Sequence, residues 1–249
     1  MPEKSDRLLA QCENIINAYR TGELGVCELP EDNAPAFAPQ DIEAKLAYFT
    51  LPMALNYRRN STQAWNAARA TCEDTTTTDV FSVEQAAQLP LDELQGRLTK
   101  YKLALQPNRH TLTWSTVAKT VDQNWGTLEG FLESTGYDFL AIQEAVQHMY
   151  RKGFPYLAGP KLFNYWAFIL GVKCGVQFKN KEYIDIAVDS HVLKCSVVLG
   201  VIAADEANSL PTEKVAERWR HRLQGSGIAP TDLNVPLWFW SRNGFAFEP

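Results

Sequence analysis

The chain has 249 residues, of which 45% are hydrophobic and 21% are charged, and its formal net charge is −5. This composition is typical of a globular protein and can bury one sizeable core or two small lobes that share a cleft. No apolar run is long enough to span a membrane, and the charged first residues lack the apolar segment of a signal peptide, so we expect a cytoplasmic protein.

The five cysteines are scattered along the chain, and none lies at the spacing of a metal-binding pair. This pattern argues against a disulfide framework, a zinc site and an iron–sulfur cluster. The chain also has only 4 His and no Gly-rich phosphate loop, which gives little support to a metal-dependent or nucleotide-dependent enzyme. We therefore expect no metal and no cofactor.

Apolar residues recur at helical spacing in four segments. In chain order these are Leu8, Cys12, Ile15, Ile16 and Tyr19; Ile42, Leu46, Phe49, Met53 and Tyr57; Phe139, Ile142, Val146 and Met149; and Val215, Trp219 and Leu223. Segments with the alternation of a strand are nearly absent. The sequence therefore predicts an all-α protein.

Turn-forming residues predict loops between these helices, at 28–40, 71–79, 106–110 and 224–232. Pro52 falls within the second apolar segment, where the missing N–H and the ring should kink or interrupt the helix just before residues 56–60.

The first chemically informative motif is Gly159-Pro160-Lys161. Gly159 allows a close backbone approach, Pro160 suits the first position of a helix, and the free amides of a helix start can hold a phosphate. Lys161 would then lie at the positive end of an apolar helix, where dipole and burial both disfavour the charged ammonium and favour a neutral nucleophilic amine. The alternative is a lysine whose ammonium reaches water or only binds phosphate.

Asp189 is a single carboxylate between two hydrophobic segments, at the expected start of another helix. One role for it is to cap that helix. Another is to stabilise an oxocarbenium-like sugar, or to activate a nucleophile, while a glycosidic bond breaks. The two roles are compatible. His191 fits packing or hydrogen bonding better than general-base chemistry, and it stays a possible catalytic residue.

The basic residues are unevenly distributed. Residues 151–194 contain seven Lys or Arg and three carboxylates, a formal charge of +4, so that the rest of the chain carries −9. Because only the local field at the contact surface matters for DNA binding, this surplus is compatible with a DNA-binding surface. It is equally compatible with chance clustering on a solvated face.

The motif Gly159-x-Lys161, followed by Ala187-Val188-Asp189-Ser190-His191, resembles the signature of the helix-hairpin-helix DNA glycosylase superfamily, L-P-G-V-G-x-K…V-D-T-H. Residues 41–66 and 211–244 extend the likeness, which is greatest to the archaeal 8-oxoguanine glycosylases and their bacterial relatives. The resemblance implies a two-lobed fold with a DNA-binding cleft between the lobes. One lobe would be a helical barrel of residues 40–172, and the other would combine residues 1–39 with 173–249.

The resemblance also implies residue roles. Lys161 matches the lysine that attacks the sugar C1′ and forms a Schiff base, and an alternative alignment brings Lys152 nearer to this role. Asp189 matches the aspartate that lyase and non-lyase members share. This chain has P-Y-L-A-G where the family has L-P-G-V-G, so the phosphate grip of its hairpin must differ, and an extra loop separates Lys161 from Asp189.

Further residues are candidates for contacts with DNA. Those expected at the phosphate backbone or as a wedge in the base stack are Arg58, Arg59, Asn60, Gly159, Lys173 and Lys179. For residues 58–60 a solvated helix end is the alternative. Those expected around a flipped base are Trp238, Trp240 and Asn164.

The resemblance thus implies a DNA glycosylase that removes an oxidised or otherwise modified base from DNA. Lys161 would add AP-lyase activity, and without lysine chemistry Asp189 and a water would suffice for base removal alone. It would act in base-excision repair or in defence against modified phage DNA. DNA is the expected partner and a monomer the expected state. The alternative is a catalytically inactive helix-hairpin-helix module that binds DNA or a protein.

Overall fold

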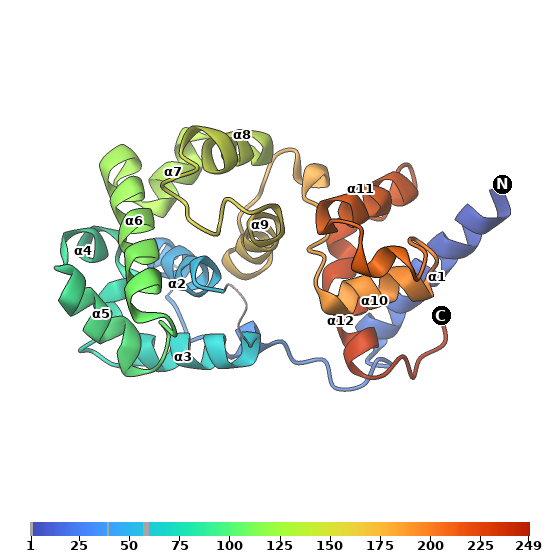
Figure 1. Ribbon diagram of the computed structural model, residues 1–249, viewed down its shortest axis with the longest axis horizontal. Coiled ribbons are helices and arrows are strands. Elements are labelled where there is room, and N and C mark those ends of the chain that lie inside the picture. Colours follow the sequence, from blue (N-terminus) through green and yellow to red (C-terminus); the bar gives the residue numbers. More distant parts are fainter. Residues whose placement is uncertain (1, 39, 57–59) are drawn as a thin grey trace. The chain divides into compact units, whose positions relative to one another are not determined.

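The computed structural model describes residues 2–38, 40–56 and 60–249, and every regular element within them is a helix (Figure 1). The all-α prediction is confirmed. Contacts divide the chain into two compact units: a central unit, Leu29–Lys181, and a terminal unit formed by Met1–Glu28 and Glu182–Pro249. The limits implied by the resemblance, residues 40 and 172, lie inside the limits of the central unit.

The central unit is built around α2, Ile42–Ala54, whose residues from Leu46 onward are all buried. A helix that is apolar on every side must be enclosed, and α2 packs against α3, α6, α7 and α9 (Figure 1). The remaining helices are α3 (Ser61–Glu73), α4 (Val83–Gln88), α5 (Leu91–Lys100), α6 (Pro107–Trp125), α7 (Leu128–Ser134), α8 (Phe139–Glu144) and α9 (Pro160–Cys174), with short 3-10 helices at Pro30–Asn33 and Thr78–Phe81.

The terminal unit joins the two ends of the chain. It contains α1 (Pro2–Thr21), α10 (Ser190–Val198), α11 (Thr212–Leu223) and α12 (Asn234–Arg242), with short 3-10 helices at Glu206–Asn208 and Pro230–Leu233 and a third, Lys181–Tyr183, at its border. Both α1 and α10 pack against α12. The core includes Ile15, Trp219 and Leu237, and the indole N–H of Trp219 donates to Ser196 Oγ at 2.8 Å.

Most residues of the predicted apolar stripes are buried. The prediction is wrong for Met149, which is 69% exposed. The cause is a π-helical turn at Ala145–Met149, in which the Tyr150 N–H donates to the Ala145 carbonyl at 2.8 Å. A π turn inserts one residue into the helical repeat, so that the next side chains rotate away from the buried face. Tyr57, the last residue of the second stripe, lies outside the described residues.

The loop predicted at 106–110 is also wrong, because α6 begins at Pro107. Proline is favourable at the first position of a helix, where the amide would have no partner in any case. The helix that contains Pro52 ends two residues later, at Ala54. In the described part of the chain, no helix is both long and apolar enough to cross a membrane.

Candidate functional site

Asp189 is the N-cap of α10 in the terminal unit. It follows the buried residues Ile186, Ala187 and Val188 and is itself half-buried. Its Oδ1 accepts the backbone N–H of His191 at 2.8 Å and that of Val192 at 2.9 Å. Among the described residues Oδ2 has no hydrogen-bond partner, so the carboxylate is held at one oxygen and open at the other.

Asn234 holds the segment that leads to Asp189. Its side-chain Oδ1 accepts the Ala187 N–H at 2.9 Å, and the residue is 5% exposed. A buried amide bonded to this segment ties the first turn of α12 to the start of α10. Its Nδ2 is buried without a hydrogen-bond partner in the described part of the chain.

His191, Trp238, Ser241 and Arg242 lie next to the start of α10. His191 Nδ1 is 3.1 Å from Ser241 Oγ, and the imidazole meets the Trp238 indole edge-on at a centroid distance of 5.5 Å. The Arg242 guanidinium lies 4.6 Å from the centroid of the Trp238 ring. Trp238 is only half-buried, so this cluster combines an aromatic surface, a cation and two polar side chains, and it is joined through His191 to the turn that Asp189 caps.

The nearby thiol of Cys195 does not add a nucleophile. Burial, together with the Asp189 carboxylate, raises its pKa to about 12, and the S–H donates to the Leu237 carbonyl at 3.2 Å. A thiol that stays protonated is inert as a nucleophile. Among the described residues, no three His, Cys, Asp or Glu side chains gather in a group that could hold a metal ion.

Lys161 lies in the first turn of α9, in the central unit. A helix, α8 with its π turn, precedes it, and residues 150–159 form the connection (Figure 1). Within this connection the Gly159 N–H donates to the Tyr156 carbonyl and the Ala158 N–H to the Phe154 carbonyl, both at 2.9 Å. These two amides are therefore occupied inside the loop, whereas the amides of Lys161 and Leu162 have no backbone partner within the described ranges.

The Lys161 side chain is exposed. It is therefore not enclosed by apolar surface, which removes one of the two reasons that the sequence offered for a nucleophilic lysine. The position at a helix start stays as the other reason. Lys152 is exposed as well, in the turn before α9. Both lysines belong to the central unit, whereas Asp189 belongs to the terminal unit.

The residues of the central unit that were predicted to contact DNA differ in exposure and in their partners within the protein. Lys173 forms an ion pair with Asp32, and Lys179 is exposed, with its backbone paired to residues 137–139. Asn60 caps α3 by accepting the Gln63 N–H at 3.0 Å. Arg58 and Arg59 lie outside the described residues.

Two of the three predicted base-pocket residues have structural partners. Trp240 is buried, and its indole N–H donates to the Phe247 carbonyl at 2.8 Å while its ring packs edge-on against Phe245. Asn164 is buried in α9 and donates to the Pro160 carbonyl at 2.8 Å. Trp238 is the residue of this set that is half-buried rather than buried, and His191, Phe239 and Arg242 contact its ring.

No protein-family model, no curated protein and no solved structure matches this chain. The residues around Asp189 are therefore interpreted from their own geometry.

Sequence reasoning did not select Asn234, Ser241 or Arg242. The contact of Arg242 with Trp238 could have been predicted, because Arg242 follows Trp238 by four residues and so lies on the same face of α12. Asn234 gave no signal, since its partner Ala187 is 47 residues away.

Proposed function

We propose that the chain is a DNA glycosylase that excises a modified base. One observation carries the proposal: Asp189 is fixed by two backbone amides at Oδ1 and is open at Oδ2, and the imidazole of His191, in the first turn of the same helix, meets the half-buried Trp238. A fixed carboxylate in a partly apolar setting suits the stabilisation of positive charge on a sugar, and an indole face suits stacking with an extruded base.

Asp189 would act as the C1′–N bond to the base breaks. Positive charge develops on C1′ and the ring oxygen, and the open oxygen of the carboxylate lowers the energy of that charge. The electron pair of the broken bond leaves with the base, which takes up a proton. Water or an amine supplies the new bond to C1′. Because the carboxylate is already oriented by α10, little reorganisation is required when the charge appears.

Lys161 is the proposed amine. Its nitrogen would bond to C1′ as the base leaves, opening of the sugar ring would give a Schiff base, and loss of a C2′ proton would expel the 3′ phosphate. The unpartnered amides of Lys161 and Leu162 at the start of α9 would hold a phosphate of the same strand.

The proposal is tested by incubating the protein with duplexes that carry 8-oxoguanine, uracil, thymine glycol, alkylated bases, hydroxymethylated or glucosylated cytosine, or an abasic site. Borohydride reduces a Schiff base and links the enzyme to the strand. We expect a linked species on one of these duplexes, lost in Lys161→Gln and retained in Lys152→Gln. The reverse pattern would move the amine role to Lys152. Excision without a linked species would leave a water-dependent glycosylase.

The second candidate is a binding module without chemistry. It is favoured by the capping bonds of Asp189, which give this residue a structural reason to be present, and by the exposure of Lys161. It predicts binding to duplex DNA, measured by fluorescence anisotropy, with no excised base on any duplex of the panel and with equal binding by wild type and Asp189→Asn.

A further inference from the structure

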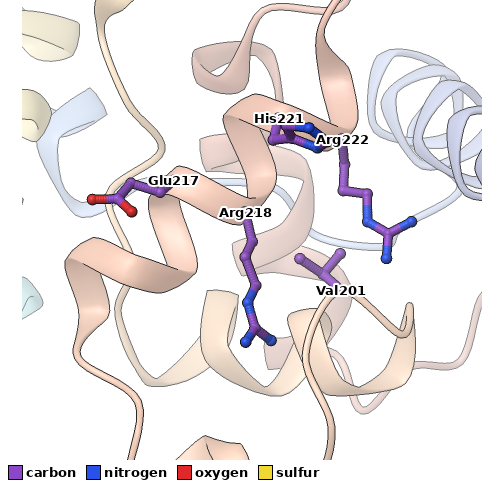
Figure 2. Close-up of a pocket in the computed structure, with 5 residues that line it drawn as sticks. All are labelled: Val201, Glu217, Arg218, His221 and Arg222. Atoms are coloured by element: carbon purple, nitrogen blue, oxygen red, sulfur yellow. The ribbon is translucent and has the colours of Figure 1, made fainter.

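An open depression of about 740 Å³ lies on the terminal unit (Figure 2). Its lining residues are Val201, Glu217, Arg218, His221 and Arg222. Four of these belong to α11, and Val201 belongs to the turn after α10. The volume is in the range of sites that hold small organic ligands. None of these residues has a part in the base excision proposed above.

The side chains are arranged with two cations around an apolar floor. Figure 2 shows Arg218 and Arg222, one helical turn apart, extending to the same side of α11 with Val201 near both guanidinium groups. Val201 is 3% exposed. The Glu217 carboxylate extends away from the two arginines in the same view. In this view the Glu217 carboxylate therefore does not stand between the two guanidinium groups.

Ion pairs neutralise most of the charge around the depression. Both terminal nitrogens of Arg218 donate to the Glu206 carboxylate at 2.6 Å, in a two-pronged pair that fixes the position of the guanidinium. The Glu217 carboxylate accepts from Lys214 at 2.8 Å. These two pairs are each neutral, so neither supplies a net charge to a ligand.

Arg222 and His221 are different, because neither has a hydrogen bond or ion pair with any other described residue. The residual charge at the depression is thus the single positive charge of Arg222, beside an imidazole that can add an N–H donor. One net positive charge matches one phosphodiester, and a guanidinium binds two phosphate oxygens at once.

We propose that this depression binds the phosphate group of a nucleotide or of a nucleic-acid strand. Arg222 would hold two phosphate oxygens, His221 would donate to a third, and Val201 would lie against the sugar or the base. Arg218, held by Glu206, would form a fixed wall. Arg222 also lies in the last turn of α11, where a cation stabilises the helix dipole. The test must separate these two effects.

Arg20 provides the matched control, because it is exposed, lies in the last turn of α1 and belongs to the same unit. Arg20→Gln and Arg222→Gln remove the same charge from equivalent positions on two helices. Circular dichroism and thermal melting establish that both variants are folded. Adenosine monophosphate, followed by titration calorimetry, probes a free nucleotide, and a labelled single-stranded oligonucleotide, followed by fluorescence anisotropy at several salt concentrations, probes a strand.

We expect Arg222→Gln to bind about tenfold more weakly than wild type, and Arg20→Gln to bind as wild type does. If this loss is seen with adenosine monophosphate, a free nucleotide is enough to occupy the depression. A response to the oligonucleotide alone identifies a strand, and the salt dependence should then fall by about 0.7 in logarithmic slope. Failure of both probes to bind wild type, equal binding by Arg222→Gln and wild type, or equal losses in the two variants would overturn the inference. Because the readout is binding, these results are independent of whether any base is excised.

Discussion

Glu31 is a carboxyl group that the fold of the central unit buries almost completely, with 2% of its surface exposed. Burial raises its pKa above the ordinary value of 4.5, although the Tyr165 hydroxyl, which donates to it at 2.5 Å, acts in the opposite direction. A raised carboxyl pKa means that ionisation of this side chain opposes folding. Below about pH 4.5 the carboxyl group is protonated in both states and does not lower the free energy of unfolding. As pH rises above that value, its ionisation lowers the free energy of unfolding.

Glu31→Gln removes this titration while keeping an oxygen for the Tyr165 hydroxyl. We expect the free energy of unfolding of the variant, relative to wild type, to increase from about pH 4 to about pH 7. Urea unfolding at several pH values measures this difference, and Glu84→Gln, an exposed glutamate of α4, is the control. A difference that does not change with pH would contradict the buried-carboxyl interpretation.

At the scale of elements, the N-terminus of α7 is capped by a side chain from another helix. The Glu43 carboxylate, in the first turn of α2, accepts the Leu128 N–H with one oxygen and the Glu129 N–H with the other, both at 2.9 Å. The first amides of a helix have no partner within it, so Glu43 satisfies two of those of α7. Thr127 adds a local cap by accepting the Gly130 N–H.

Replacing Glu43 should therefore destabilise the central unit in steps. Glu43→Gln keeps one acceptor and loses one, whereas Glu43→Ala leaves both amides without it. We expect a loss of about 1–3 kcal/mol of unfolding free energy for Glu43→Ala and a smaller loss for Glu43→Gln. Chemical denaturation of wild type and the two variants measures their free energies of unfolding. Equal values for Glu43→Ala and wild type would show that the cap contributes nothing.

The 3-10 helix at Glu206–Asn208 is tied to α11 by Glu206 and Arg218. This pairing lowers the pKa of Glu206 from 4.5 to about 2. A lowered carboxyl pKa contributes stability above the ordinary value, and that stability is lost as pH falls toward the folded value. Wild type should therefore lose stability between about pH 4.5 and about pH 2 more steeply than Glu206→Gln does. Thermal melting across this interval tests the expectation, and parallel pH profiles would contradict it.

These elements also show how far the sequence alone leads. Helical periodicity located the apolar faces of α1, α2 and α11, because burial of one face depends on nearby residues. It failed at Met149, since the π turn that exposes this side chain leaves the apolar spacing unchanged. It also cannot find the cap of Leu128 by Glu43, which joins residues 85 positions apart.

For the candidate site the same limit applies. The hydrophobic segment before Asp189 and the start of a helix after it were readable, and the resulting N-cap is present. The bond from Ala187 to Asn234 and the contact of His191 with Ser241 depend on how α10 packs against α12. Because this packing joins residues far apart in the sequence, the sequence predicted the N-cap at Asp189 but not the residues that contact its surroundings.

At the scale of the whole molecule, the chain distributes its candidate chemistry over two units. The terminal unit contains Asp189 and Trp238, and the central unit contains Lys161 and the loop before it. The terminal unit is made of residues from both ends of the chain, with the whole central unit inserted between them. The proposed enzyme therefore depends on an aspartate and a lysine that fold into separate cores.

The central claim is that Asp189 has a chemical role in addition to capping α10. Asp138 provides a comparison, because its Oδ1 also caps a helix, α8, by accepting the Leu140 N–H at 2.9 Å, although its Oδ2 accepts from Asn180 at 2.8 Å. Asparagine is as good an N-cap as aspartate, so both Asp→Asn variants should stay folded.

The decisive measurement is the single-turnover rate of base excision by wild type, Asp189→Asn and Asp138→Asn, on the duplexes of the panel. We expect Asp189→Asn to be slower by about 100-fold or more, with Asp138→Asn close to wild type. Equal rates for the two variants, or no excision by wild type from any duplex, would contradict the claim.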